Sequence, residues 1–378
     1  MTVFGPHPDR TPPDPTQRPA PTQPALTRLV VDLSAFDRNL DALRARVAPA
    51  DLMFVVKNDA YGQGLEPLVA RALARGVGWI GCLDLGTAQR VRAFAGPGPR
   101  LLAWLLSPDD ELAAGIRSDI DLGIGSLIVL EAVAATAEAL GATARVHLKI
   151  DTGLNRNGVR REDWPGFVAR AAALETQGRI AVHGVWSHIS EASDAEDDLA
   201  RARFEGAVEQ ARAAGLAPRL RHLAASAAGT LRPEFDYDLV RMGAFPSGIA
   251  PAGGPYADEL GLTPIAALHT TVTAVGAGTA VIPVGSWHGL PSNAAGRVTV
   301  AVRGVALPVL RIAPEHAVLD AAGIGLVGIP FAAGDDVVVF GDGSAGSITA
   351  TAWAEAIGTI GEELHTRLDP RLPRDYLG

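Results

Sequence analysis

The sequence predicts an α/β protein, a (β/α)8 TIM-like barrel followed by a smaller, mostly-β C-terminal domain. Three observations support this fold class. Eight strand-like runs alternate with helical segments, several of the strand ends carry charged or hydroxyl side chains, and after about residue 260 the pattern changes to short Val-, Thr- and Gly-rich runs. At 378 residues the chain is long enough for two domains.

The predicted barrel strands are short apolar runs bounded by turn signals. They are Leu52 to Lys57, Trp79 to Asp84, Leu101 to Leu106, Leu122 to Ser126, Arg145 to Asp151, Val182 to His188, Leu220 to Ser226 and Tyr237 to Gly243. Between them lie segments with apolar residues at helical spacing, such as Glu66 to Arg75, Leu127 to Leu140 and Asp198 to Ala214. Because such barrels place chemistry at the C-terminal strand ends, we expect the polar side chains there to form a site.

The domain limits follow from composition. Residues 1–26 hold eight prolines among polar residues, which predicts a disordered tail. We expect the barrel over residues 27–260 and the β domain over residues 261–378. Predicted strands of the β domain are Thr271 to Val275, Ala280 to Val284, Arg297 to Val302 and Asp336 to Phe340.

Composition also restricts the function. Apolar content is 48%, and no apolar run approaches about 18 residues, so a soluble protein without a membrane span is expected. The net charge of −9 disfavours a nucleic-acid or anionic-membrane partner. Cys82, the single cysteine, lies in an apolar run, which indicates core packing and fits a reducing cytoplasm. No compact ligand spacing indicates a metal site, so small-molecule chemistry is the default expectation.

Lys57 is the first candidate catalytic residue. It emerges where the apolar run Leu52 to Val56 leaves the core and enters a glycine-punctuated turn. A lysine on a rigid element is able to lose water, lower its pKa and act as a nucleophile or base, whereas the alternative is a snorkelling lysine at a strand end. The same rim holds further polar side chains, and this coincidence favours a site: Lys149, His188, Ser226 and Arg241.

Several segments, in order, resemble the alanine racemases. They are VVKNDAYGQG (55–64), VHLKIDTGLNRNG (146–158), HGVWSHISEASD (183–194), HLAASAAGTL (222–231), DLVRMGAFPSGIAP (238–251) and RLPRDY (371–376). The resemblance runs from about Leu29 to Tyr376 and implies a pyridoxal 5′-phosphate enzyme with a barrel and a C-terminal β domain.

The resemblance implies roles for the barrel residues. Lys57 would form the Schiff base with the cofactor and serve as one catalytic base. Arg241 would lie against the pyridine nitrogen, where a permanently charged guanidinium prevents that nitrogen from gaining a proton and restrains side reactions. The remaining positions implied to hold the cofactor's ring and phosphate are Tyr61, His188, Ser226, Gly243 and Ala244.

Three of these implied roles have plain alternatives. Arg156 would contact the substrate carboxylate and the phenol of a second base, or else form a surface ion pair. Lys149 matches a lysine that is often carbamylated in the family, where the carbamate orients that arginine; the alternative is an unmodified structural lysine. His188 would contact the cofactor, or else is a strand-end histidine without a ligand.

The chain departs from the family at the second base. Racemisation by two bases needs a proton carrier on each face of a planar intermediate, and the family uses a tyrosine in Gly-Tyr-Ala-Asp-Gly. Here the segment reads Gly285-Ser286-Trp287-His288-Gly289, which puts Ser286 at the base position. His288 would share a face with Ser286 in an extended segment and has a suitable pKa, so it is a candidate replacement; the alternative is a loop histidine beside an exposed Trp287.

Other departures also fall in the β domain. The family's Met-Asp at the active-site entrance reads Pro314-Glu315, and a tyrosine-bearing loop is missing between Val275 and Ala280. The tyrosine that contacts the cofactor's phosphate aligns with Glu362. A carboxylate facing a phosphate is repelled unless it turns away or is protonated.

The leading prediction is a racemase that interconverts L- and D-alanine or a similar small amino acid as a cytoplasmic homodimer. In the family, the second base and the entrance residues come from the other subunit. One alternative is a single-base pyridoxal-phosphate enzyme performing exchange, decarboxylation or aldol-type chemistry, although such decarboxylases commonly use a β-domain cysteine and Cys82 lies in the barrel. The other is a catalytically poor pyridoxal-phosphate-binding protein.

Overall fold

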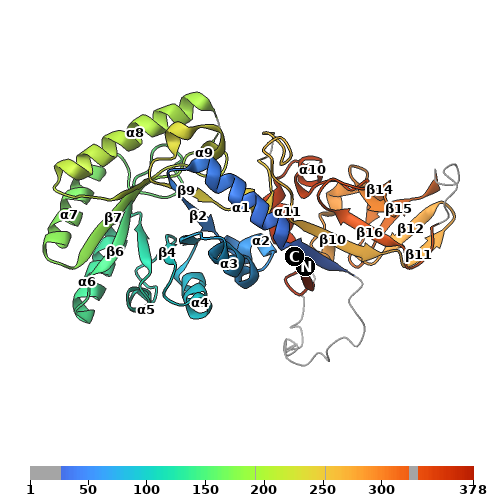
Figure 1. Ribbon diagram of the computed structural model, residues 1–378, viewed down its shortest axis with the longest axis horizontal. Coiled ribbons are helices and arrows are strands. Elements are labelled where there is room, and N and C mark those ends of the chain that lie inside the picture. The colour runs from blue at the N-terminus through green and yellow to red at the C-terminus, as the bar shows by residue number, and fades with distance from the viewer. Residues whose placement is uncertain (1–26, 192, 252, 323–330) are drawn as a thin grey trace, which may run out of the picture.

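The computed structural model describes residues 27–191, 193–251, 253–322 and 331–378, so the predicted disordered tail over residues 1–26 lies outside the described part. Two sheets organise the chain: a parallel sheet of eight strands and a sheet of nine strands. In Figure 1 the helix-covered parallel sheet and the β domain lie side by side, with α1, α2 and α11 labelled in the region where they meet.

The parallel sheet is the predicted barrel. Its strands are β2 (Asp51–Val55), β3 (Trp79–Cys82), β4 (Arg100–Ala103), β5 (Asp121–Ile124), β6 (Ala144–Lys149), β7 (Ile180–Trp186), β8 (Leu220–His222) and β9 (Leu239–Met242). The order is β8-β7-β6-β5-β4-β3-β2-β9. Between β8 and β9, Asp238 N–H donates to the Arg221 carbonyl (3.1 Å) and Arg241 N–H donates to the Ala224 carbonyl (3.3 Å), which nearly closes the ring. All eight predicted strands and the fold class are confirmed.

Helices cover the outside of the barrel, as the periodicity predicts. They are α1 (Leu33–Val47), α3 (Leu65–Ala74), α4 (Leu85–Ala95), α5 (Leu112–Arg117), α6 (Leu127–Leu140), α7 (Trp164–Thr176), α8 (Asp194–Ala213) and the short α9 (Ala228–Leu231). Side-chain oxygens cap several of their N-termini: Asp32 accepts from Ala35 N–H (2.9 Å) and Asp84 from Thr87 N–H (2.7 Å). Two short elements, α2 (Lys57–Gly62) and the 3₁₀ turn η2 (Phe245–Ser247), follow strand ends at the rim.

The nine-stranded sheet forms the β domain. Its strands are β1 (Arg28–Asp32), β10 (Ala266–Thr271), β11 (Ala274–Gly276), β12 (Thr279–Ile282), β13 (Thr299–Val302), β14 (Val305–Ile312), β15 (Ala317–Asp320), β16 (Asp336–Phe340) and β17 (Arg374–Leu377). The domain also carries α10 (Ala350–Glu355), α11 (Gly361–Arg367) and the 3₁₀ turns η3 (Ser286–His288) and η4 (Ser292–Ala294). The strand predicted over Thr271 to Val275 is wrong as one element, because β10 ends at Thr271 and β11 begins at Ala274.

The position of β1 differs from the expected barrel limits. Residues 28–32 fall within the 27–260 barrel range, yet β1 pairs antiparallel with β10 and parallel with β17. The N-terminal strand therefore belongs to the sheet of the β domain. The backbone of an apolar strand needs hydrogen-bonding partners, and β1 finds them in β10 and β17. The chain enters the barrel only after β1, through α1.

The barrel interior is divided into an apolar and a polar part. Met53, Trp79, Leu102 and Leu239 form a small buried cluster inside it, while a continuous outer core joins the strands to the covering helices. Cys82 is fully buried, and burial raises the pKa of its thiol to about 12, which confirms core packing. Among the residues described, no helix is both long and apolar enough to cross a membrane.

Candidate active site

A cavity of about 450 Å³ lies at the C-terminal ends of the barrel strands. All the barrel residues singled out from the sequence line it: Lys57, Tyr61, Lys149, Arg156, His188, Ser226, Arg241, Gly243 and Ala244. These residues come from strand ends that lie up to 187 positions apart in sequence, from Lys57 to Ala244. Among the described residues, Glu362 of the β domain is the one lining residue beyond Pro251.

The sequence contains only two lysines, Lys57 and Lys149, and both line this cavity. Every other basic side chain in the chain is an arginine or a histidine. A snorkelling lysine at a strand end would leave its amine in solvent, whereas both amines here face one enclosed space. The lysine count is a sequence signal that would have strengthened the assignment of Lys57.

The turn that carries Lys57 has an unusual backbone. Four non-glycine residues after Lys57, Asn58 to Tyr61, have φ between 51° and 58°, and Gly62 follows at 74°. Left-handed backbone costs a non-glycine residue roughly 1–2 kcal/mol, so surrounding contacts must hold this turn. Within it, the Asp59 side chain accepts from Leu65 N–H (3.0 Å) and the Asp59 carbonyl accepts from Gly64 N–H (3.0 Å).

The β domain supplies further contacts to the same turn. Arg374 Nε, from β17, donates to the Gly62 carbonyl (2.8 Å), and Tyr376 OH donates to the Gln63 carbonyl (3.0 Å). From α11, the His365 carbonyl lies 3.0 Å from where a Cβ on Gly62 would stand. The position of Lys57 therefore depends on residues at the far end of the chain.

Lys57 lies in an electrostatic environment suited to amine chemistry. Its Nζ is 5.2 Å from the centre of the Tyr61 ring. Burial lowers the pKa of Lys57, the charge of Glu362 opposes this lowering, and Arg156 adds to it. The net lowering favours the neutral amine, which is the nucleophilic form.

Arg241 is fixed by carbonyl oxygens. Its guanidinium donates to the carbonyls of Ser187 (2.8 Å), His222 (3.0 Å) and Leu223 (3.0 Å) and to His188 Nδ1 (3.1 Å). Burial lowers the pKa of Arg241 to about 9, which leaves it charged at neutral pH. Because an arginine is only a donor, His188 Nδ1 must accept, so its proton sits on Nε2. Burial, and then Arg241, lower the pKa of His188 and keep it neutral.

A chain of buried hydrogen bonds runs from Arg241 into the barrel. Arg241 Nη1 contacts His222 Nδ1 (3.3 Å), His222 Nε2 contacts His147 Nδ1 (2.9 Å), and His147 Nε2 contacts Asp121 (3.1 Å). With Arg241 as donor, each histidine accepts on Nδ1 and donates from Nε2, and the chain ends on a carboxylate. His147 and His222 both stand in segments quoted from the sequence, but nothing in their spacing revealed that they meet.

Asp121 is also bonded by Arg100 Nη2 (2.5 Å) and Arg145 Nε (2.5 Å). Burial alone would raise the pKa of Asp121, but the hydrogen bond from His147 and the neighbouring arginines outweigh it and lower the pKa. The ionised carboxylate is therefore the native form that closes this chain.

Lys149 and Arg156 form the other side of the cavity. Lys149 Nζ lies 4.4 Å from the centre of the Trp186 ring, a neighbour that the sequence did not single out. Burial, then Arg241 and Arg156, lower the pKa of Lys149 to about 7. Arg156 is exposed, and no ion pair to it is found among the described residues.

The part of the cavity around Gly243 requires a glycine. A Cβ at Gly243 would lie 2.1 Å from the Tyr61 hydroxyl, so no larger residue fits there without moving that buried phenol. Gly243 N–H contacts Ser226 Oγ at 3.4 Å. Gly243, the Ser226 hydroxyl and the Tyr61 phenol thus lie together at one end of the cavity, and small residues with hydroxyl groups suit a phosphate.

Ser286 and His288 do not line the cavity that this chain forms. The expected extended segment is wrong, because Ser286 to His288 form the 3₁₀ turn η3 and residues two apart on such a turn point in different directions. His288 Nδ1 accepts from Gly285 N–H (3.1 Å), which stabilises the turn and uses one ring nitrogen. Trp287 beside it is 68% exposed.

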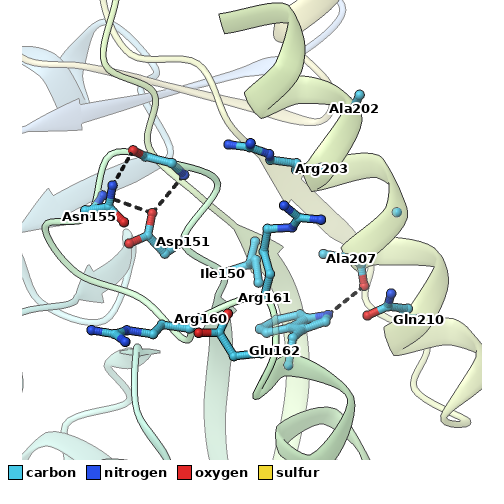
Figure 2. Close-up of a pocket in the computed structure, with 13 residues that line it drawn as sticks. Ile150, Asp151, Asn155, Arg160, Arg161, Glu162, Ala202, Arg203, Ala207 and Gln210 are labelled. Carbon is cyan, nitrogen blue, oxygen red and sulfur yellow. Dashed lines mark hydrogen bonds between the residues drawn. The ribbon is translucent and has the colours of Figure 1, made fainter. Parts of the chain in front are cut away.

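A larger cavity, about 1090 Å³, lies between α8 and the loop after β6 (Figure 2). Arg160, Arg161 and Arg203 line it, and Arg203 Nη1 donates to the Thr152 carbonyl (2.9 Å). Neither lysine is among its lining residues. The loop that leads to Arg156 borders this cavity. Within the loop, the Asp151 side chain accepts hydrogen bonds from Gly153 N–H (2.9 Å) and Asn155 N–H (3.1 Å).

Lys57 follows the first barrel strand, β2, Arg241 stands on the last, β9, and both side chains line one cavity of a barrel that is followed by a β domain. The family model for the N-terminal domain of alanine racemase matches residues 31–251, and that for the C-terminal domain matches residues 264–376. The chain belongs to the alanine racemase family and is a pyridoxal 5′-phosphate-dependent enzyme.

Named relatives agree over nearly the whole chain. An alanine racemase of Beutenbergia cavernae is 40% identical over 94% of this chain and 99% of its own length. One of Salinispora arenicola is 38% identical over 92% of this chain and 97% of its own length. The crystal structure of alanine racemase from Streptomyces lavendulae, a D-cycloserine producer, superposes with a TM-score of 0.88 at 36% identity and covers 94% of this chain and 98% of its own. The structure of alanine racemase from Streptomyces coelicolor A3(2) superposes with a TM-score of 0.88 at 33% identity and covers 93% of this chain and 98% of its own.

The residues of the cavity fit pyridoxal phosphate. The cofactor needs an amine for its aldehyde, a partner for its ring nitrogen and donors for its phosphate. Lys57, Arg241 and the cradle around Gly243 offer these in one cavity of about 450 Å³. In the described part of the chain, no group of three His, Cys, Asp or Glu side chains is arranged to hold a metal ion.

Proposed function

We propose that this protein is an amino-acid racemase that interconverts L- and D-alanine or a similar small amino acid. Lys57 would carry the cofactor and act as one base, and Arg156 would bind the substrate carboxylate. The names of the relatives and the composition of the cavity support this proposal. The small free volume of the cavity supports a small substrate.

The observation that carries the proposal is the combination of Lys57 and Arg241 in one cavity. Bound pyridoxal phosphate acidifies the Cα–H bond of an attached amino acid. Arg241, tied to carbonyls and backed by the chain to Asp121, would hold its charge against the ring nitrogen and keep a proton off it. A ring restrained in this way leaves the proton transfers at Cα to the side chains of the protein.

Lys149 would position Arg156. A pKa of about 7 provides a neutral amine, the form that reacts with carbon dioxide to give a carbamate. The resulting negative charge would be favourable beside Arg241 and Arg156, whose positive charges oppose an ammonium there. Loading with ¹³C-bicarbonate should give a carbamate signal in ¹³C NMR that Lys149→Ala removes.

A homodimer in a reducing cytoplasm completes the proposal. Leu105 lines the cavity yet is 55% exposed, and this apolar surface at the site supports coverage by a second copy. The single buried cysteine is compatible with a reducing compartment. The net charge of −9 argues against nucleic-acid and anionic-membrane partners.

The test is proton NMR of the cofactor-loaded protein in deuterated water with L-alanine and D-alanine separately. Exchange at Cα with inversion from both enantiomers is the expected result. Absence of exchange with alanine and with other small amino acids would refute racemase activity.

A second candidate is a single-base pyridoxal-phosphate enzyme or a catalytically poor cofactor-binding protein. The observation favouring it is that neither Ser286 nor His288 lines the cavity of its own chain. Exchange from one enantiomer only would support single-base chemistry. Cofactor binding without any exchange would support the binding protein.

A further inference from the structure

The larger cavity, of about 1090 Å³, has no part in the proposed chemistry. Helix α8 forms one of its walls, and the loop after β6 forms another (Figure 2). Its basic lining residues are Arg160, Arg161 and Arg203, and its acidic lining residues are Asp151 and Glu162. This local excess of positive charge contrasts with the net charge of −9 for the whole chain. A cavity of this composition is suited to an anion.

The arginines of this cavity lack the carboxylate partner that a neighbour on α8 has. Arg201 Nε lies 3.3 Å from Glu205, whereas Arg160, Arg161 and Arg203 form no ion pair with any described residue. Figure 2 shows Arg161 extending to the same side as Arg203, while Arg160 extends away from α8. Arg161 and Arg203 therefore offer two uncompensated charges to one ligand.

The two carboxylates of the cavity do not neutralise these charges. The Asp151 side chain accepts from Gly153 N–H (2.9 Å) and Asn155 N–H (3.1 Å), so it is engaged within its own loop. Glu162 is exposed and forms no ion pair in the described part of the chain. A ligand that binds here must supply the missing negative charge.

Arg203 is held against the loop, but not all of its donors are bonded. Its Nη1 donates to the Thr152 carbonyl (2.9 Å), and a Cβ at Gly153 would lie 2.8 Å from the same nitrogen, so the glycine leaves room for the guanidinium. The Nε of Arg203 is buried and has no hydrogen-bond partner among the described residues. An unpaired buried donor is costly, and an oxygen of a bound anion would satisfy it.

A phosphate group matches this arrangement best. As a monoester it carries about −1.5 to −2 charges near neutral pH, which balances Arg161 and Arg203, whereas one carboxylate carries a single charge. The fixed fork of a guanidinium also binds two oxygens of a phosphate with parallel hydrogen bonds. The cavity is as large as the sites that enclose whole small molecules, about 300–1,000 Å³, so it leaves room for the organic part of a phosphate ester.

The loop after β6 separates the two cavities and contributes to both. Asp151, Gly153 and Asn155 line the larger cavity, whereas Arg156 and Asn157 line the catalytic cavity. A ligand that restrains one side of this loop therefore also restrains the side chains that enter the catalytic cavity.

Arg161 and Arg203 stand at opposite ends of the loop. Arg203 holds Thr152 near its start, and Arg161 follows closely after Val159 at its end. Val159 N–H donates to the Lys149 carbonyl (2.9 Å), which closes the base of the loop. A phosphate bound by both arginines would join the two ends and stabilise the segment between them.

We propose that the larger cavity binds a small-molecule phosphate between Arg161 and Arg203, and that the bound phosphate stabilises the loop that presents Arg156 to the substrate. Binding of phosphate is independent of the proposed function, whereas its effect on the substrate rests on that function. Because Arg156 would bind the substrate carboxylate, phosphate lowers the KM for alanine and leaves kcat unchanged.

The first test is calorimetric titration of the cofactor-loaded protein, freed of excess cofactor, at constant ionic strength. The ligands are inorganic phosphate, glycerol 3-phosphate and succinate. Saturable binding of both phosphates is expected, and succinate, whose two charges lie on separate carboxylates, should bind more weakly. Tighter binding of glycerol 3-phosphate than of inorganic phosphate would identify an organic phosphate as the ligand, and equal binding would identify free phosphate.

Two variants test the location of the site. Arg161→Gln removes one charge and should raise the Kd for phosphate about tenfold or more. Gly206→Glu acts from α8, where Gly206 lines the cavity and has nothing within 4 Å of its Cβ position, so the added carboxylate should repel the phosphate to a similar extent. Glutamate is also a better helix former than glycine, so this variant should fold. Arg90→Gln, which removes an exposed arginine of α4 outside the cavity, is the matched control and should keep the parent Kd.

The second test measures alanine racemisation with and without saturating phosphate. The KM for alanine should fall about fivefold with kcat unchanged, and Arg161→Gln should lose this response. A phosphate bound to Arg156 in the catalytic cavity would instead compete with the substrate carboxylate and raise the KM. The sign of the change therefore distinguishes the two cavities.

The outcomes separate the phosphate site from the proposed function. Phosphate binding that Arg161→Gln and Gly206→Glu weaken and Arg90→Gln retains supports the site even if the parent protein racemises no amino acid, in which case the proposed function and the effect on KM fail. Absence of phosphate binding, or equal binding in all variants, overturns the site. An unchanged or raised KM overturns the link to Arg156, and tighter binding of succinate than of phosphate overturns the choice of a phosphate.

Discussion

The barrel and the β domain contribute to the cavity in different ways. The barrel supplies almost all of the lining from its strand ends and the turns after them, and one of these side chains, Arg241, is held by buried hydrogen bonds that continue to Asp121. In the described part of the β domain, Glu362 is the one lining residue, and the domain otherwise acts from outside the cavity, where Arg374 and Tyr376 hold the turn of Lys57. The departures from the family's segments that were noted in the sequence lie in the β domain, at Ser286, Pro314-Glu315 and Glu362. We therefore expect cofactor binding to depend on the barrel. We expect proton transfer at the substrate Cα to depend on the β domain.

Replacing Lys57 tests the barrel half most severely. Lys57→Ala should abolish the cofactor's absorbance shift and the adduct trapped by borohydride, and should lower any turnover by at least about 10²- to 10⁴-fold, because the amine that binds the aldehyde is gone. Peptide mapping of the trapped parent protein measures this directly. A borohydride-trapped adduct on Lys149 would mean that Lys149, and not Lys57, binds the cofactor's aldehyde.

Breaking the buried chain should cost stability. Asp121→Ala leaves Arg100 and Arg145 without their buried carboxylate, and we expect a loss of about 3–5 kcal/mol in urea unfolding. The control Asp41→Ala removes a half-exposed partner of Arg75 and should cost less than about 1 kcal/mol. Equal losses would contradict the importance of the interior chain.

The same carboxylate predicts a pH dependence. Its pKa is lowered in the folded protein, so its stabilisation is complete above the unfolded value of about 3.9 and is lost as the pH falls below it. The difference in stability between the parent protein and Asp121→Ala should therefore shrink on acidification. A difference that stays constant down to about pH 2 would exclude ionisation of Asp121 as its cause.

Filling the cradle should weaken cofactor binding. Gly243→Ala forces a Cβ against the Tyr61 hydroxyl, at a cost of about 1–3 kcal/mol, or roughly tenfold to a hundredfold in the Kd for pyridoxal phosphate. Gly206→Ala, in α8 with open space around it, should leave the Kd unchanged. An unaltered Kd in Gly243→Ala would mean that the phosphate lies elsewhere.

Loosening the contact from the β domain should have a smaller effect. Tyr376→Phe removes the hydrogen bond to the Gln63 carbonyl and should cost about 0.5–1.5 kcal/mol, with slower trapping of the cofactor on Lys57. Tyr256→Phe removes an exposed bond to Glu355 and should not change the trapping rate. If both variants trap the cofactor at the same rate, contacts other than the Tyr376 hydrogen bond hold the turn of Lys57.

The smallest effect on cofactor affinity is expected for Ser286→Ala and His288→Ala. Neither side chain lines the cavity of its own chain, so the Kd should remain within about threefold of the parent value. Their effect on inversion is the informative measurement. Unchanged inversion in His288→Ala would eliminate His288 as the second base, whereas lost inversion would mean that a partner chain delivers it.

Much of the site could be predicted because its residues stand in short local patterns. The strand ends at Lys57, Lys149 and Arg241 are marked by apolar runs that stop at a polar residue, and parallel strands in a barrel bring such ends to one rim. The four left-handed residues after Lys57 could not be predicted, because Ala60 and Tyr61 do not favour that backbone and contacts from the distant residues Arg374 and Tyr376 help to hold it. The same holds for η3, whose turn depends on His288 accepting from Gly285.

The sequence alone determined the eight-strand barrel, the following β domain, and the lysine and arginine of its rim, since periodicity and motif order are local properties. Only the tertiary structure decided that β1 joins the C-terminal sheet, that His222 and His147 link Arg241 to Asp121, and that α11 brings Glu362 to the cavity of Lys57. Each of these depends on contacts between segments far apart in sequence. Such contacts are selected by the packing of the whole chain, which no local pattern encodes.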